Sequence, residues 1–177
     1  MLTSAQRGHL LALAHASIER QVRGGAPIET GTMPLPEGSG VFVTIKERGH
    51  LRGCLGTLKN RAGLAAEVSR CAAESASEDP RFPPVTVDEL PGLSLEISVL
   101  GPLEEIEARP DSITIGVHGL VAEQGYHRGL LLPQVATEWG WDAEQFLRQT
   151  CVKADLPPDA WRKGARVFRF AAEVFGD

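Results

Sequence analysis

Apolar residues recur at helical spacing near the start of the chain. One face of the predicted helix carries an apolar stripe made of Leu10, Leu11, Ala14, Ile18 and Val22. Thr3 and Gln6 fit a capping box at its beginning, and Gly24 with Gly25 supplies a left-handed stop at its end. The pattern therefore predicts a helix that begins near Thr3 and ends near Val22.

The same spacing predicts three more helices further along the chain. The apolar face of the second helix carries Leu64, Ala65, Val68, Cys71, Ala72 and Ser75. Pro133 suits the first turn of a third helix, and Gly140 ends it. Asp142 caps the start of a fourth helix, and Trp141 and Phe146 stand where a hydrophobic staple would place them.

Alternation of apolar and polar residues predicts the strands. It is clearest where Leu93, Leu95, Ile97 and Val99 alternate with Ser94, Glu96 and Ser98. The other predicted strands cover residues 41–45, 51–58, 113–117, 120–123, 130–132 and 166–175. In the last of these, one face carries Phe168, Phe170, Ala172 and Val174.

These helices and strands do not follow a strict β-α-β-α order. That arrangement favours an α+β fold with a mostly antiparallel sheet flanked by helices over a doubly wound parallel sheet. The chain has 177 residues and no internal repeat, so we expect a single domain over residues 1–177.

The composition narrows the choice of partner and compartment. Lys and Arg total 18 and Asp and Glu total 23, a formal net charge of −5, which makes nucleic acid an unlikely partner because such proteins normally carry a basic face. No apolar run approaches the ~18 residues that span a bilayer, and no signal peptide is apparent. The three cysteines lack the spacing of a disulfide framework or a zinc knuckle, so a cytoplasmic protein is expected.

The most unusual segment for chemistry is residues 51–57, Leu-Arg-Gly-Cys-Leu-Gly-Thr. On a strand Arg52 and Cys54 share one face, and a guanidinium beside a thiol favours the nucleophilic thiolate. Gly53 and Gly56 leave backbone N–H groups unshielded and allow close approach by a ligand, so both are candidate ligand-binding residues. One interpretation is therefore a site that reacts covalently or holds an anion. The other is that Cys54 is a small buried residue and Arg52 a surface charge.

The proline-rich loop 79–84 is a second candidate, because it presents Arg81 and Phe82 between prolines. A rigid loop loses little entropy on binding, so Arg81 and Phe82 are candidate ligand contacts. The alternative is a connector in which Asp79 and Arg81 form an ion pair. Cys71 and Cys151 lie on apolar helix faces and are expected in the core.

His118, between Val117 and Gly119, is the third candidate. Its ordinary pKa suits a general acid or base, although a turn histidine bonded to the backbone is the alternative. Its spacing from His127 matches no common metal motif, so no metal is predicted. Dinucleotide, P-loop and nucleophile-elbow motifs are absent from the sequence, which leaves the cofactor unassigned.

Taken in order, these motifs resemble those of the AMMECR domain family, which in bacteria supplies protein A of the AmmeMemoRadiSam system. The matching segments are residues 51–57, 79–84, 116–120, 131–136 and 141–154, and the likeness extends from about Val41 to Phe175. The resemblance implies an α+β fold with a larger lobe built from both chain ends and a smaller lobe. It also implies two partners, a Memo-like protein of the dioxygenase type and a radical SAM protein.

Two functions follow as hypotheses. In the first, the chain handles a small molecule or catalyses a step, with Cys54 as nucleophile or acceptor, Arg52 as its activator, Arg81 positioning the substrate and His118 moving protons. In the second, it is a non-catalytic adaptor whose motif loops form a docking surface for a partner protein.

Overall fold

The computed structural model describes residues 1–36 and 40–177, which form two compact units. Unit 1 comprises Met1–Leu100 and Glu173–Asp177, and unit 2 comprises Gly101–Ala172. The larger unit is thus built from both chain ends, as expected. All strand pairs whose register is resolved are antiparallel, so the α+β prediction is confirmed.

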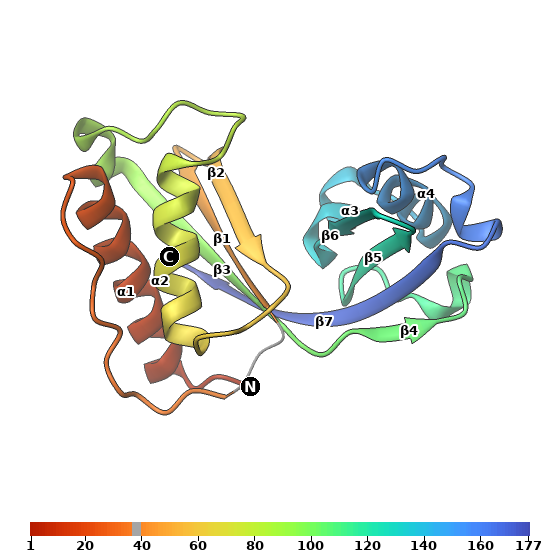
Figure 1. Ribbon diagram of the computed structural model, residues 1–177, viewed down its shortest axis with the longest axis horizontal. Coiled ribbons are helices and arrows are strands. Elements are labelled where there is room, and N and C mark those ends of the chain that lie inside the picture. The colour runs from red at the N-terminus through yellow and green to blue at the C-terminus, as the bar shows by residue number, and fades with distance from the viewer. Residues whose placement is uncertain (37–39) are drawn as a thin grey trace. The chain divides into compact units, whose positions relative to one another are not determined.

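Unit 1 is a sheet with two long helices on one face (Figure 1). Its elements are α1 (Ser4–Val22), β1 (Gly40–Glu47), β2 (His50–Thr57), α2 (Leu64–Ser77), the 3-10 helix η1 (Val87–Gly92) and β3 (Leu93–Leu100). The strand order is β2-β1-β3, followed by the C-terminal end of β7 (Arg166–Gly176). Strand β2 therefore forms an edge of this sheet.

The alternating pattern of the strands decides which face the helices cover. Val41, Val43 and Ile45 of β1 lie in one buried cluster with Leu95, Ile97 and Val99 of β3 and with the apolar faces of α1 and α2. The predicted capping box at Thr3 is present, and α1 ends at Val22 before Gly24, whose φ is 73°. Polar residues of β1 and β3 consequently lie on the opposite face.

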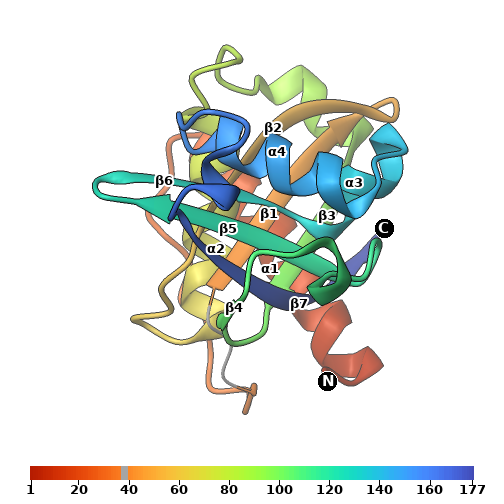
Figure 2. The same cartoon turned by 90° about the vertical axis from the view of Figure 1, so that its right-hand side faces the viewer.

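Unit 2 packs helices α3 (Pro133–Trp139) and α4 (Ala143–Lys153) against the hairpin of β5 (His118–Gln124) and β6 (His127–Leu131) (Figure 2). Strand β7 pairs with β5 on one side and with β4 (Glu104–Ile106) on the other. Short 3-10 helices cover Pro110–Ser112 and Ala160–Arg162. The predicted cap at Asp142 and the C-cap at Gly140 are confirmed, and the ring centroids of Trp141 and Phe146 lie 6.5 Å apart, as a staple requires.

One strand prediction is wrong. Residues 113–117 form a turn instead of a strand, because Pro110 begins a 3-10 helix and Gly116 has a φ of 80°. Strand β4 was not expected from the sequence. The predicted strand at 166–175 is confirmed as β7, but the face predicted to be apolar is unevenly buried, since Phe170 is buried and Val174 is 39% exposed. Residues of β7 belong to both units.

None of the helices in the described ranges has the length and apolar character needed to cross a membrane.

Candidate functional site

Loop 79–84 covers the outer edge of β2 at Cys54. The backbone N–H of Cys54 donates to Oδ2 of Asp79 at 2.9 Å, and Nη2 of Arg81 donates to the Cys54 carbonyl oxygen at 3.3 Å. An edge strand carries backbone groups without a neighbouring strand, and these two contacts supply partners for both groups of Cys54. We call the group Thr44, Cys54, Asp79, Arg81 and Phe82 the Cys54 site.

Asp79 fixes the loop to the strand. Its side chain is only 3% exposed, and it accepts from Nε and Nη2 of Arg81 at 3.0 and 2.7 Å. The hydrogen bonds from Arg81, together with that from the Cys54 amide, lower the pKa of Asp79 to about 2 despite its burial. The ion pair expected in the connector interpretation is therefore present.

Arg81 is held firmly but remains accessible. Its guanidinium lies 5.6 Å from the centroid of the Phe82 ring, and half of its side chain, 52%, is exposed. Its Nη1 has no acceptor among the residues that the structure describes. Arg81 can thus donate hydrogen bonds from a fixed position to a molecule outside the unit.

Arg52 does not act on the thiol, contrary to the sequence expectation. A register irregularity between Ile45 and Lys46 leaves Arg52 without a partner in β1. Its guanidinium instead forms a bidentate pair with Glu89, at 2.7 and 3.1 Å, and donates to the carbonyl oxygens of Pro83 and Pro84. Only 12% of the Arg52 side chain is exposed, so it serves as a clamp between β2, loop 79–84 and η1.

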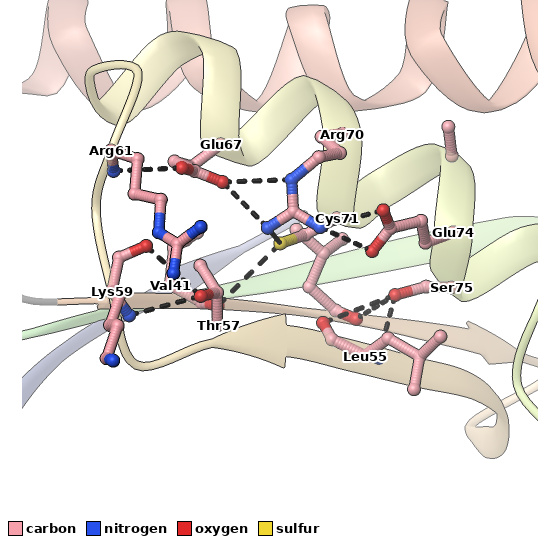
Figure 3. Close-up of polar contacts among 12 residues, drawn as sticks. Val41, Leu55, Thr57, Lys59, Arg61, Glu67, Arg70, Cys71, Glu74 and Ser75 are labelled. Carbon is pink, nitrogen blue, oxygen red and sulfur yellow. Dashed lines mark hydrogen bonds and ion pairs between the residues drawn. The ribbon is translucent and has the colours of Figure 1, made fainter.

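The glycines of the motif provide space for other parts of unit 1. A Cβ on Gly53 would stand 2.2 Å from the carbonyl oxygen of Ser75 in α2, and one on Gly56 would stand 2.4 Å from the Phe42 ring. The Ser75 hydroxyl meanwhile accepts from the Leu55 N–H and donates to the Val43 carbonyl (Figure 3). At these glycines the close approach is thus made by α2 and by Phe42, and not by a ligand as predicted.

The Cys54 thiol is partly exposed and carries its proton at neutral pH. Burial raises the pKa of Cys54, while the hydroxyl of Thr44, 3.2 Å from the sulfur, and the charge of Arg81 lower it less. The charges of Asp79 and Glu96 add to the increase. The expectation of a stabilised thiolate is therefore wrong, because the thiol is desolvated and faces two carboxylates as well as one guanidinium.

The sequence alone did not identify Thr44 and Glu96 as neighbours of Cys54, nor the role of Asp79 in fixing loop 79–84 to β2. Thr44 pairs with Cys54 on one side and with Glu96 on the other, which places the three residues in one row across the sheet. The alternation in β3 had already put Glu96 opposite the apolar face. Only the register of β1 between β2 and β3, which spacing alone does not give, would have joined it to Cys54.

His118 lies in unit 2, as the first residue of β5. The backbone N–H of Thr114 donates to its Nδ1 at 2.9 Å, so the neutral ring carries its proton on Nε2. Burial and the charge of Arg169 lower the pKa of His118, and Glu104 opposes them. The ring is neutral near pH 7 and can donate from Nε2, whereas protonation of Nδ1 would break the bond to Thr114.

The remaining cysteines are structural. Cys71 and Cys151 are buried in the cores of units 1 and 2, and burial raises the pKa of Cys71 to about 12. Next to Cys71, Arg70 bridges Glu67 and Glu74 along the surface of α2 (Figure 3). In residues 1–36 and 40–177, no three His, Cys, Asp or Glu side chains gather in a way that could hold a metal ion.

Comparisons with known proteins agree on one family. The family model described as AMMECR1 matches residues 11–175. A protein of Methanothermobacter thermautotrophicus is 45% identical over 94% of this chain and 91% of its own length, and one of Thermococcus onnurineus is 48% identical over 94% and 87%. The crystal structure of the uncharacterised protein PH0010 from Pyrococcus horikoshii superposes with a TM-score of 0.89 at 43% identity, over 95% of this chain and 89% of that one.

Proposed function

Because this chain belongs to the AMMECR1 family, we propose that it is a protein-binding component of the AmmeMemoRadiSam system. The proposed partners are a Memo-like protein of the dioxygenase type and a radical SAM protein. In this proposal the partners carry out the chemical step, and the Cys54 site is the surface that one of them recognises.

The observation that carries the proposal is the state of Arg81. A buried carboxylate fixes its guanidinium, yet half of the side chain is exposed. A preordered side chain loses little entropy when a partner binds, and arginine is enriched among the residues that dominate interface energies.

The electrostatics of the candidate residues support binding over catalysis. The pKa of Cys54 is raised, the guanidinium of Arg52 is occupied by Glu89 and two carbonyl oxygens, and Nδ1 of His118 already accepts from the backbone. A nucleophile or general base needs the opposite: a lowered thiol pKa or an accessible lone pair.

The experiment measures binding to each partner separately. The Memo-like protein and the radical SAM protein of the same organism are titrated calorimetrically with the wild-type chain and with variants. We expect Arg81→Glu to weaken binding of one partner at least about tenfold, the loss typical of an interface hot spot. Arg23→Glu at the C-cap of α1, where Arg23 pairs with Glu19, is the matched charge reversal and should bind normally.

Two further variants sharpen the result. Phe82→Ala leaves the Asp79–Arg81 pair intact and should also weaken binding, which keeps the test valid where charge reversal disturbs the loop. Cys54→Ser should bind like the wild type. The proposal fails if neither partner binds, or if both the Arg81 and the Phe82 variants bind as tightly as the wild type.

The second candidate function is small-molecule handling at Cys54, favoured by a partly exposed thiol next to the Thr44 hydroxyl and Arg81. Mass spectrometry of the chain copurified with the radical SAM protein distinguishes it. A bound small molecule retained by the wild type and lost in Cys54→Ser would favour this function over docking.

A further inference from the structure

Trp139, at the C-terminal end of α3, is the most exposed of the tryptophans. Its side chain belongs to a residue that is 70% exposed, whereas Trp161 is 8% exposed. A large aromatic side chain with this much surface in water is unusual, because tryptophan is highly buried on average. The exposure therefore calls for a physical explanation.

The ring is nevertheless held in place. Trp139 stacks on Trp141 with ring centroids 6.1 Å apart and an angle of 16° between the planes. Trp141 in turn contacts Phe146, which is fully buried in the core of unit 2. The Trp139 indole is thus linked through Trp141 to the core of unit 2, while most of its own surface remains exposed.

The chain segment that carries the stack is acidic. Residues 138–144 contain two tryptophans, three carboxylates and no cationic residue. Glu144 is paired with Arg162, and Asp142 caps α4, but Glu138, the residue before Trp139, is exposed. Trp139 is also the last residue of α3, where the helix dipole favours a positive charge.

Contacts between arginine and aromatic rings recur within the chain. Four arginines lie over aromatic rings within the chain: Arg7 on Phe175, Arg81 on Phe82, Arg162 on Trp161 and Arg166 on Phe168, at 4.5 to 5.9 Å from the ring centroids. Within the described ranges, no cation of the chain covers Trp139 in this way. A guanidinium over an indole is also the most favourable pairing of this kind.

We propose that the Trp139–Trp141 stack binds an arginine side chain of a partner polypeptide. The guanidinium lies flat on the open face of Trp139 and is attracted by Glu138 and the C-terminal end of α3. The ligand class is a flexible, arginine-containing peptide segment. This surface lies in unit 2 and uses none of the residues of the Cys54 site, so the inference does not depend on the proposed function.

The test uses a short synthetic peptide with two arginines and a second peptide in which citrulline replaces both. Citrulline keeps the planar shape of the side chain but removes its charge. Calorimetry and tryptophan emission follow binding to the wild-type chain and to Trp139→Ala, which removes an exposed side chain. Tyr126→Ala removes the fully exposed tyrosine of the same unit and is the matched control.

We expect the arginine peptide to bind the wild type and the Tyr126 variant equally, and Trp139→Ala about fivefold more weakly, the size of one exposed cation–π contact. The citrulline peptide should bind the wild type at least as weakly as the arginine peptide binds Trp139→Ala. Glu138→Gln should weaken binding less than Trp139→Ala does. The inference is overturned if the arginine peptide does not bind, if citrulline binds equally well, or if Trp139→Ala leaves the affinity unchanged.

Discussion

Replacing Asp79 by Asn tests whether one buried carboxylate holds the Cys54 site together. The amide keeps the shape of the side chain and can still accept a hydrogen bond, but it loses the charge that faces Arg81. The pKa of Asp79 falls from an ordinary 3.8 to about 2 in the folded chain. Since a tenfold change in proton affinity corresponds to about 1.4 kcal/mol, the ionised form contributes about 2.5 kcal/mol to folding.

Because Arg81 is exposed, losing the Asp79 charge should cost no more than this contribution to folding. Breaking a fully buried ion pair costs about 3–5 kcal/mol because the remaining charge has no partner. Arg81 is 52% exposed, so water can solvate its guanidinium after the substitution. We therefore expect Asp79→Asn to lower the free energy of unfolding by about 2.5 kcal/mol at pH 7.

The difference between the two proteins should depend on pH with a definite sign. The folded-state pKa of Asp79 is lowered, so its contribution is fully present well above the unfolded-state value of 3.8 and is lost as the pH falls through about 2. At pH 3 linkage leaves about half of the effect, roughly 1.3 kcal/mol. Glu89 also has a pKa lowered to about 2 by Arg52, but it is unchanged in both proteins and cancels from the difference.

Urea unfolding followed by far-UV circular dichroism measures this difference. Helices α1 and α2 of unit 1, with 19 and 14 residues, dominate the helical signal, whereas all three tryptophans lie in unit 2, so tryptophan emission follows unit 2 separately. A destabilisation below about 1 kcal/mol at pH 7, or one of equal size at pH 7 and pH 3, would refute the assigned role of Asp79.

Three other changes test the packing and the chemistry of the same unit. Cys54 should react with iodoacetamide at pH 7 more slowly than free cysteine, since burial raises its pKa; peptide mass spectrometry measures the rate, and a faster reaction would contradict the protonated thiol. Gly53→Ala should cost about 1–3 kcal/mol in urea unfolding, because its Cβ would meet the carbonyl oxygen of Ser75. Gly8→Ala, in α1 with no atom within 4 Å of its Cβ, should instead stabilise the chain by about 0.5–1 kcal/mol, and the pair of variants should move the midpoint in opposite directions.

Local chemistry made much of the fold predictable. Capping boxes at Thr3 and Asp142 and the left-handed Gly140 fix helix ends through bonds between residues a few positions apart. Residues 113–117 show the limit of such reasoning. Their β-branched residues favour a strand, but Thr114 donates its N–H to the His118 ring, and its carbonyl accepts from Val117 and His118. Those contacts depend on how the turn folds and not on the propensity of the segment.

The Cys54 site was harder to predict, because distant segments decide the role of each motif residue. Arg52 lies two positions from Cys54 in sequence, yet its partners are Glu89 and two carbonyl oxygens more than 30 residues away. The positive charge that lowers the pKa of Cys54 is that of Arg81. Glu96, which raises this pKa, lies across Thr44 from Cys54 because of the register between β1 and β3. Spacing within a motif gives none of these distances.

Most residues of the two motifs around Cys54, 51–57 and 79–84, therefore hold unit 1 together, and only a small part of them is accessible. Gly53 leaves room for α2, Arg52 binds Glu89 of η1, and Asp79 accepts the hydrogen bond of the Cys54 N–H at the edge of β2. Each of these residues thus has a role that folding alone explains. What remains for a partner is the exposed portion of Arg81 and the adjoining Phe82 ring. A surface of fixed geometry with an aromatic ring, a guanidinium and no activated nucleophile has the properties of a recognition site, and variants of Arg81 and Phe82 should separate recognition from folding where variants of Asp79 and Gly53 cannot.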